Sequence, residues 1–182
     1  LAHVRGGTGF LRGHHFVEGR QRRLSIAGLH VGAAQLQQVS RAGGALGGFG
    51  QAFTDSINPD QITLPYADTI KAADWIKAQP WADADRMVAG GGSYGGFLAS
   101  TLLGRPHPFK ALIAHAAVYN NFTQIASDYG AEHDRFHEFW EKPAEFMSGS
   151  PHSSAANFNT PTLVIHGLLD RRVPVNHGLE LF

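Results

Sequence analysis

The chain has 182 residues, a length that suits one domain with a sizeable hydrophobic core. Its 15 basic and 15 acidic residues balance, which excludes a strongly basic or strongly acidic protein. It contains no cysteine, so disulfides are excluded, and no apolar run long enough for a transmembrane helix, so no membrane partner is expected.

Residues 1–46 form an atypical Arg/Gly-rich segment. The chain starts with Leu1 rather than methionine and shows no signal-peptide pattern, which suggests a fragment or a processed product. The segment holds six arginines, nine glycines and one acid, a net charge of +5, whereas residues 47–182 hold nine basic and fourteen acidic residues, a net charge of −5. Its one plausible strand is residues 24–29, because no sustained hydrophobic period is present elsewhere.

A basic stretch at residues 20–23, Arg-Gln-Arg-Arg, could be read as a nucleic-acid patch. No aromatic platform accompanies these arginines. We therefore predict a solvated or disordered arm and no nucleic-acid partner.

The pattern changes at residue 47, where a folded-looking region opens with residues 47–53. Residues 66–78 predict a helix, since Tyr66, Ile70, Ala73 and Ile76 form one apolar stripe and acids alternate with lysines on another face.

Next comes a strand–turn–helix unit built around Ser93. Residues 86–89 are a short apolar run and predict a strand, and residues 94–103 carry apolar side chains at helical spacing. Between them, Gly91, Ser93 and Gly95 satisfy G-x-S-x-G, the pattern of a nucleophile elbow, in which a strained turn exposes the serine hydroxyl above the sheet. A glycine-rich turn with an incidental serine is the alternative, but the flanking strand and helix favour a nucleophile.

Two further buried strands are predicted at residues 110–118 and 162–166, both of them apolar runs. Residues 120–150 between them are polar and aromatic, with a helix that places Phe136, Phe139 and Trp140 together. A last helix begins after residue 173. Strands that alternate with helices predict a parallel α/β sheet.

Three stretches in this order resemble the prolyl oligopeptidase family of serine peptidases, nearest in flavour to its acylaminoacyl-peptidase and dipeptidyl-peptidase branch. They are residues 47–53, residues 83–96 (which end in Gly-Gly-Gly-Ser-Tyr-Gly-Gly), and residues 160–174 (which contain His-Gly-Leu-Leu-Asp-Arg-Arg-Val-Pro). The resemblance covers residues 47–182 and implies a partial α/β-hydrolase fold, truncated at its C-terminal end and irregular at its N-terminal end.

The resemblance implies that Ser93 is the nucleophile and Asp170 the triad carboxylate, in the chain order of α/β-hydrolases. Asp170 follows a predicted strand, and α/β sheets gather their chemistry at the carboxyl ends of strands. The Tyr94 N–H is the expected oxyanion donor at the start of a helix, and Gly91, Gly95 and Gly96 are the elbow glycines. An ordinary turn aspartate is the alternative for Asp170.

The triad histidine is expected to be absent from the chain. His177 is the only histidine after Asp170 and comes too early, so we predict a surface residue there. His166 is expected to shape the site. His133 and His137 have the i, i+4 spacing of helical metal ligands, but no third ligand is evident, so solvated histidines are predicted there and at His14 and His15, with no metal and no organic cofactor.

The family also carries a His-Gly-Gly-Pro-like segment on an early strand, which residues 1–46 lack. One hypothesis is that these residues are a frameshifted translation of the early sheet, and the alternative is a genuine divergent arm. The encoding nucleotides distinguish these two possibilities, because a frameshift requires that another reading frame encode an apolar strand or the His-Gly-Gly-Pro-like segment.

The expected function of the complete enzyme is hydrolysis of oligopeptides through an acyl-enzyme on Ser93. The chain itself is expected to turn over little or nothing, because the activating base is missing. A carboxylesterase-like acyl hydrolase and a catalytically inert fragment or interaction module are the alternatives. Unpaired apolar sheet edges predict aggregation or dependence on a partner.

Overall fold

The structure, a computed structural model, describes residues 52, 55, 60–125, 127–128 and 140–182. Several sequence predictions fall outside these residues: the strand at 24–29, the basic stretch at 20–23, the opening of the folded region at 47–53 apart from Ala52, and the histidines at 14, 15, 133 and 137.

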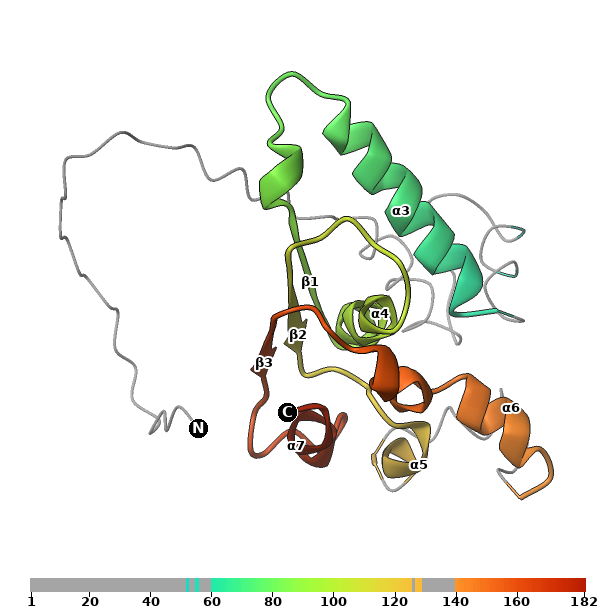
Figure 1. Cartoon of the computed structure of the whole chain (residues 1–182). Helices are drawn as coiled ribbons and strands as arrows, with labels where there is room; N and C mark the ends of the chain where they lie inside the picture. The colour runs from blue at the N-terminus through green and yellow to red at the C-terminus, as the bar shows by residue number, and fades with distance from the viewer. Residues whose placement is uncertain (1–51, 53–54, 56–59, 126, 129–139) are drawn as a thin grey trace, which may run out of the picture.

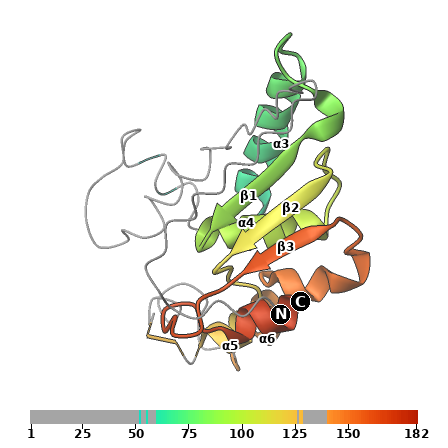
Figure 2. The ribbon, with the colours of Figure 1, turned by 90° about the vertical axis from the view of Figure 1, so that its left-hand side faces the viewer.

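The centre of the fold is a parallel three-stranded sheet, as the alternation of strands and helices predicts. Its strands β1 (Val88–Gly92), β2 (Ala111–His115) and β3 (Thr162–Ile165) lie side by side in that order. Figure 2 shows the three strands face-on. Because all run in the same direction, their carboxyl ends lie at one edge of the sheet.

Helices α3 (Thr63–Lys77) and α4 (Tyr94–Leu103) lie on one face of this sheet (Figure 1). The core lies between that face and α4, where Leu112 of β2 and Leu102 of α4 are almost fully buried, and Ala73 brings α3 against the same cluster. The predicted helix at 94–103 is confirmed in full. None of the helices in the described residues is long and apolar enough to cross a membrane.

The opposite face of the sheet carries exposed apolar side chains. Parallel register places Ile113 beside Leu163 and His115 beside Ile165, and Leu163 is 55% exposed and Ile165 44% exposed. Val88 on β1 is 47% exposed. No helix within the described part of the chain lies in front of this face in Figure 2.

Helix α3 begins three residues earlier than the predicted start at 66. The Asp60 carboxylate accepts hydrogen bonds from the N–H groups of Ile62 and Thr63 at 3.0 and 2.6 Å, which satisfies two donors that the start of a helix leaves open. Pro65 lies in the first turn, where its missing N–H does no harm. Partial burial raises the pKa of Asp60, but these backbone N–H groups, the Thr63 hydroxyl and the Arg105 charge together hold that pKa below its usual value.

The strand predicted at 86–89 is wrong in its bounds. Residues Ala84–Arg86 instead form a 3-10 turn, η1, and Asp83 accepts a hydrogen bond from the Asp85 N–H at its start. Strand β1 runs from Val88 into the elbow glycines. Glycine favours strands weakly, so the pattern of apolar residues misses this extension, which comes from pairing with β2 along its whole length.

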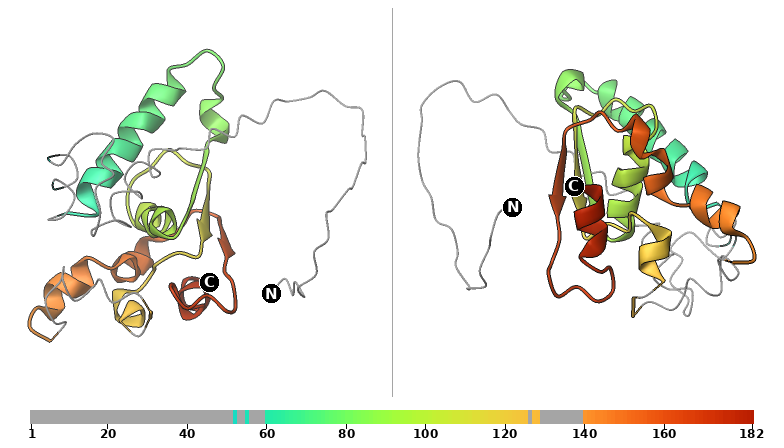
Figure 3. Two further views of the ribbon diagram at one scale, coloured as in Figure 1. Left: turned by 180° about the vertical axis from the view of Figure 1, so that it is seen from behind. Right: turned by 60° about the horizontal axis from the view of Figure 1, so that its bottom comes forward.

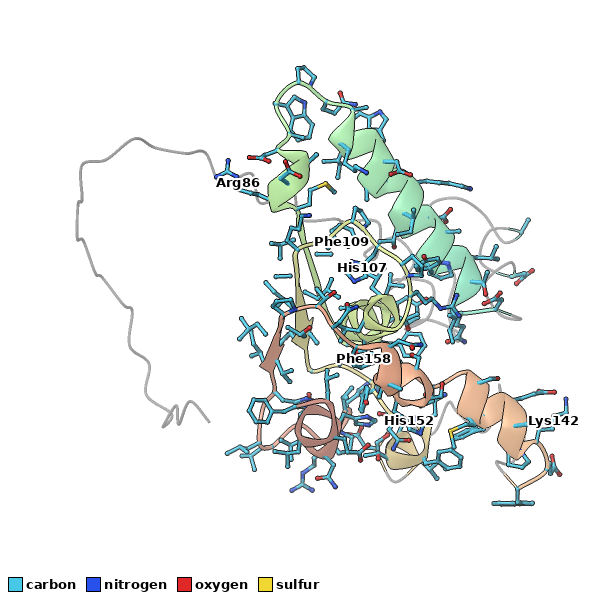
Figure 4. All side chains as sticks on the ribbon, viewed as in Figure 1. Arg86, His107, Phe109, Lys142, His152 and Phe158 are labelled. Carbon is cyan, nitrogen blue, oxygen red and sulfur yellow. The ribbon has the colours of Figure 1, made fainter. Side chains whose placement is uncertain are left out.

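The other two strands are shorter than the predicted ranges. Strand β2 ends at His115 because Ala116 adopts φ 43°, a left-handed conformation that turns the chain out of the sheet. Strand β3 ends at Ile165, one residue before the prediction. Ahead of β2, His107 stacks on Phe109 (Figure 4) and lies 3.1 Å from the Thr160 hydroxyl, which links the connections that enter β2 and β3.

Short helices occupy the lower part of the molecule in Figure 1. They are α5 (Asn121–Gln124), α6 (Pro143–Ser148), the 3-10 segment η3 (Pro151–Asn157) and α7 (Asn176–Leu181). Figure 3 shows α7 close to β3 and α5 from two further directions. Of the aromatic cluster predicted within 120–150, Phe136 and Phe139 lie outside the described residues and Trp140 is exposed in a turn.

Candidate active site

Ser93 occupies the turn between β1 and α4, and its side chain is exposed. Its backbone has φ 57° and ψ −117°, a conformation that residues other than glycine rarely adopt. Two hydrogen bonds hold it there: its N–H donates to the His115 carbonyl at 3.0 Å, and its carbonyl accepts from the Phe97 N–H at 2.9 Å. The sheet and the helix together therefore fix a strained serine whose hydroxyl faces solvent.

The predicted elbow glycines lie where the backbone leaves little space. A Cβ on Gly91 would lie 2.5 Å from the Gly95 carbonyl carbon, and a Cβ on Gly96 would lie 2.7 Å from the Ala117 Cα. Real Cβ atoms do not approach backbone this closely. Gly91 thus lets the chain reverse against Gly95, and Gly96 lets α4 approach the end of β2.

Tyr94 is the first residue of α4, where backbone N–H groups point out of the N-terminal end of a helix. Its side chain is buried, stacks on Phe97 with ring centroids 5.5 Å apart, and donates its hydroxyl hydrogen to the Gln61 carbonyl at 2.8 Å. This contact ties the elbow to the segment that precedes α3. The helix dipole at this end favours a developing negative charge near Ser93.

Asp170 lies in the turn that follows β3 and is partly buried. Its Oδ1 atom accepts hydrogen bonds from the N–H groups of Arg172 at 3.0 Å and Val173 at 2.9 Å. Within the described residues, Oδ2 accepts no hydrogen bond. One carboxylate oxygen therefore fixes the turn.

The structure brings Ser93 and Asp170 to the same edge of the sheet, two strands apart. The strand ends are linked in turn, because Ser93 N–H bonds to the last residue of β2 and Ala116 N–H bonds to the Ile165 carbonyl of β3 at 2.8 Å. Two strand spacings separate β1 from β3 by roughly 10 Å.

His177 is buried, so the predicted surface position is wrong. It is 0% exposed, and its Nδ1 accepts hydrogen bonds from the N–H groups of Tyr119 at 3.1 Å and Asn120 at 3.2 Å. Burial lowers the pKa of His177 to about 4, although the nearby Glu180 carboxylate opposes the shift. A neutral ring whose Nδ1 is bound to backbone cannot serve as the base for Ser93.

His166 lies directly after β3 and holds the backbone that follows Asp170, residues 171–173, which we call the acid turn. Its Nε2 is 2.7 Å from the Val173 carbonyl, so this nitrogen carries the proton that is donated. This arrangement agrees with the expectation that His166 shapes the site. Within the described residues, no group of three His, Asp or Glu side chains could hold a metal ion.

Gln124 is a site residue that the sequence did not indicate. It is 1% exposed, and its side-chain amide donates to the Arg172 carbonyl, next to Asp170, at 2.8 Å. A glutamine in a polar segment carries no local signal for such a contact, because its partner is 48 residues away in the chain.

The chain is similar to known peptidases in sequence and structure. It is 35% identical over 141 residues to dipeptidyl-peptidase 5 of Schizosaccharomyces pombe, covering 74% of this chain and 21% of that protein. An acylaminoacyl peptidase of Pyrococcus horikoshii superposes with a TM-score of 0.58 at 26% identity, over 65% of this chain and 20% of that one. A puromycin hydrolase, at 19% identity and a TM-score of 0.67 over 74% of this chain and 21% of that one, shows the shared fold alone.

The chain spans about a fifth of the length of these relatives and has part of an α/β-hydrolase catalytic domain. The model of the prolyl oligopeptidase family matches residues 38–182, which contain every described element and both Ser93 and Asp170. On this match, and on the serine elbow and acid turn that the fold brings to one edge, the chain belongs to the prolyl oligopeptidase family.

Proposed function

We propose that this chain supplies the nucleophile and the acid of a serine peptidase that hydrolyses short peptides. The observation that carries the proposal is the strained, exposed Ser93 at the N-terminus of α4, at the same sheet edge as Asp170. The relatives named as peptidases support a peptide substrate, and one acylaminoacyl peptidase structure holds the peptide-like inhibitor Z-Gly-Gly-Phe-chloromethyl ketone.

In the proposed reaction an imidazole takes the proton of the Ser93 hydroxyl as the oxygen attacks the peptide carbonyl carbon. The Tyr94 N–H donates a hydrogen bond to the oxyanion, and Asp170 Oδ2 supports the imidazolium. That imidazolium then protonates the leaving amine as the peptide C–N bond breaks. Water, activated by the same imidazole, hydrolyses the ester on Ser93 and restores the serine.

We propose that the imidazole does not come from the described histidines near the acid turn. His166 donates its Nε2 hydrogen to Val173, and His177 accepts two backbone hydrogen bonds through Nδ1. The 182-residue chain is therefore expected to bind an active-site probe without rapid reaction. Loss of one triad member typically lowers turnover by several orders of magnitude.

A fluorophosphonate probe tests this proposal in two polypeptides. One is the chain itself, and the other is the chain extended with the corresponding C-terminal segment of the S. pombe dipeptidyl-peptidase 5. We expect labelling only of the extended chain and its loss in Ser93→Ala. In Asp170→Asn of the extended chain, kcat for a peptide p-nitroanilide should fall by about four orders of magnitude. Robust Ser93-dependent labelling of the 182-residue chain would show that it contains its own base.

Substrate class is tested on the extended chain with a peptide p-nitroanilide and a p-nitrophenyl ester. The proposal expects hydrolysis of both, with Ser93→Ala abolishing both. Hydrolysis of the ester alone would indicate a carboxylesterase-like enzyme. A folded extended chain that neither takes up the probe nor cleaves either substrate would indicate an inert interaction module.

A further inference from the structure

The backbone that follows Asp170 is held at three successive carbonyl groups. The Arg171 carbonyl accepts from the Asp128 N–H at 3.1 Å, the Arg172 carbonyl from the Gln124 side-chain amide at 2.8 Å, and the Val173 carbonyl lies 2.7 Å from His166 Nε2. Each donor comes from outside the acid turn, residues 171–173.

The same peptide groups present their N–H hydrogens to Asp170. The N–H of Arg172 and the N–H of Val173 both donate to Asp170 Oδ1. The Arg172 carbonyl and the Val173 N–H belong to one peptide plane. A donor that fixes the direction of that carbonyl therefore also fixes the N–H that orients the carboxylate.

We infer that Gln124 is a positioning residue that orients the Asp170 carboxylate through the Arg172–Val173 peptide. This inference rests on the proposed role of Asp170 as the triad acid. Gln124 donates one amide hydrogen to Arg172 and the other to the Ser127 hydroxyl at 2.8 Å, so both of its donors are used. Asp170 Oδ2 is then directed by a chain of contacts that starts in α5.

A packing role alone does not account for a glutamine at this position. The side chain is 1% exposed, and its buried Oε1 atom has no hydrogen-bond partner among the residues that the structure describes. A buried acceptor without a partner is unfavourable, whereas an apolar side chain of similar size would fill the same space without that penalty. The two hydrogen bonds that the amide donates, to the Arg172 carbonyl and the Ser127 hydroxyl, explain why a glutamine stands at this position.

Amide hydrogen exchange in the full 182-residue chain, measured by mass spectrometry with fragmentation to single residues, tests the contact without any reaction at Ser93. In Gln124→Met, which keeps the side-chain length and removes the donor, we expect exchange at the Arg172 and Val173 N–H groups to accelerate about tenfold or more. The Phe97 N–H in α4 should keep its exchange rate. Thr123→Val is the matched control, because it removes a neighbouring hydrogen bond, to Glu180, that does not reach the acid turn.

The catalytic consequence is measured in the chain extended with the S. pombe segment. Gln124→Met should lower the saturating rate of fluorophosphonate labelling about tenfold and leave the half-saturating probe concentration unchanged, whereas Thr123→Val should change neither. Unchanged exchange at Arg172 and Val173, or equal acceleration throughout the chain, would overturn the inference. Failure of the extended wild-type chain to react at Ser93 would instead contradict the proposed function, and the exchange result does not depend on it.

Discussion

At the scale of single residues, the elbow around Ser93 is shaped by close backbone approach. Gly91 faces the Gly95 backbone and Gly96 faces Ala117 at distances that no Cβ can occupy. The strained φ of Ser93 is held by bonds to a strand on one side and a helix on the other. Strain of this kind persists only where the surrounding structure over-determines it.

Alanine at either crowded glycine should destabilise the fold. Gly91→Ala and Gly96→Ala are each expected to lower the free energy of unfolding by about 2–3 kcal/mol, because backbone must move to admit the methyl group. Urea denaturation measures the change. Gly167→Ala is the control, since the nearest atom to its added Cβ is 3.9 Å away, and a change as large as those at the elbow would contradict the steric explanation.

The strain at Ser93 predicts that glycine is more stable than alanine at this position. Glycine adopts φ 57° and ψ −117° with little penalty, so Ser93→Gly should be more stable than Ser93→Ala by about 1 kcal/mol. Both variants lose the hydroxyl, so the comparison isolates the backbone. Equal unfolding free energies for the two variants would mean that the turn stores no strain.

The sequence patterns that predict Ser93 and Asp170 as site residues lie next to these residues in the chain. Ser93 was predicted from its glycines and flanking helix, and Asp170 from a strand and the stretch after it. The burial of His177 depends on Tyr119, 58 residues away, and the role of Gln124 depends on Arg172, so neither has a local pattern. The end of β1 was misplaced for a related reason, since its glycines become a strand only through pairing with β2.

At the scale of elements, α7 is fixed to the segment around α5 by two side chains. His177 accepts the N–H groups of Tyr119 and Asn120, and Glu180 accepts hydrogen bonds from the Asn120 amide at 2.8 Å and the Thr123 hydroxyl at 2.5 Å. This attachment places α7 directly after the acid turn.

The attachment of α7 should weaken in mild acid. Burial holds the pKa of His177 at about 4, so between pH 6.5 and 4 the unfolded chain binds a proton that the folded chain excludes. Stability is thus expected to fall by about 3 kcal/mol as the pH drops through this window, and to stay level above it. Thermal unfolding across this range measures the effect.

His177→Gln is the matched variant, because its amide oxygen can still accept a backbone hydrogen bond and does not titrate. It should be less stable than the wild type at pH 7 and should show a flatter dependence between pH 6.5 and 4. If wild type and variant lose stability in parallel over this window, another group is responsible.

At the scale of the whole molecule, helices cover one face of the sheet and leave apolar side chains exposed on the other. Leu163 and Ile165 of β3 and Val88 of β1 lie on this face. Strand β3 is also the last strand of the described sheet, so its outer edge adds backbone donors and acceptors to the exposed surface. A face and an edge of this kind favour association with other copies.

Polar substitutions on the open face should reduce self-association. Leu163→Thr combined with Ile165→Thr is expected to shift the chain from large assemblies towards monomer in sedimentation velocity. Leu179→Thr is the control, because Leu179 is 60% exposed but belongs to α7 and not to the exposed face of the sheet. A wild-type chain that sediments as a monomer and melts cooperatively would contradict this prediction.

The parallel order of the strands also determines when the sheet can form during synthesis of the chain. No strand of the described sheet can pair with its neighbour through a hairpin, and the contacts that fix the acid turn require β3 to be in place. A ribosome takes roughly 2–10 s to add the chain between residues 115 and 162. During that interval the nascent polypeptide already contains its serine elbow while β2 has an unpaired edge, a period in which chaperones can bind it.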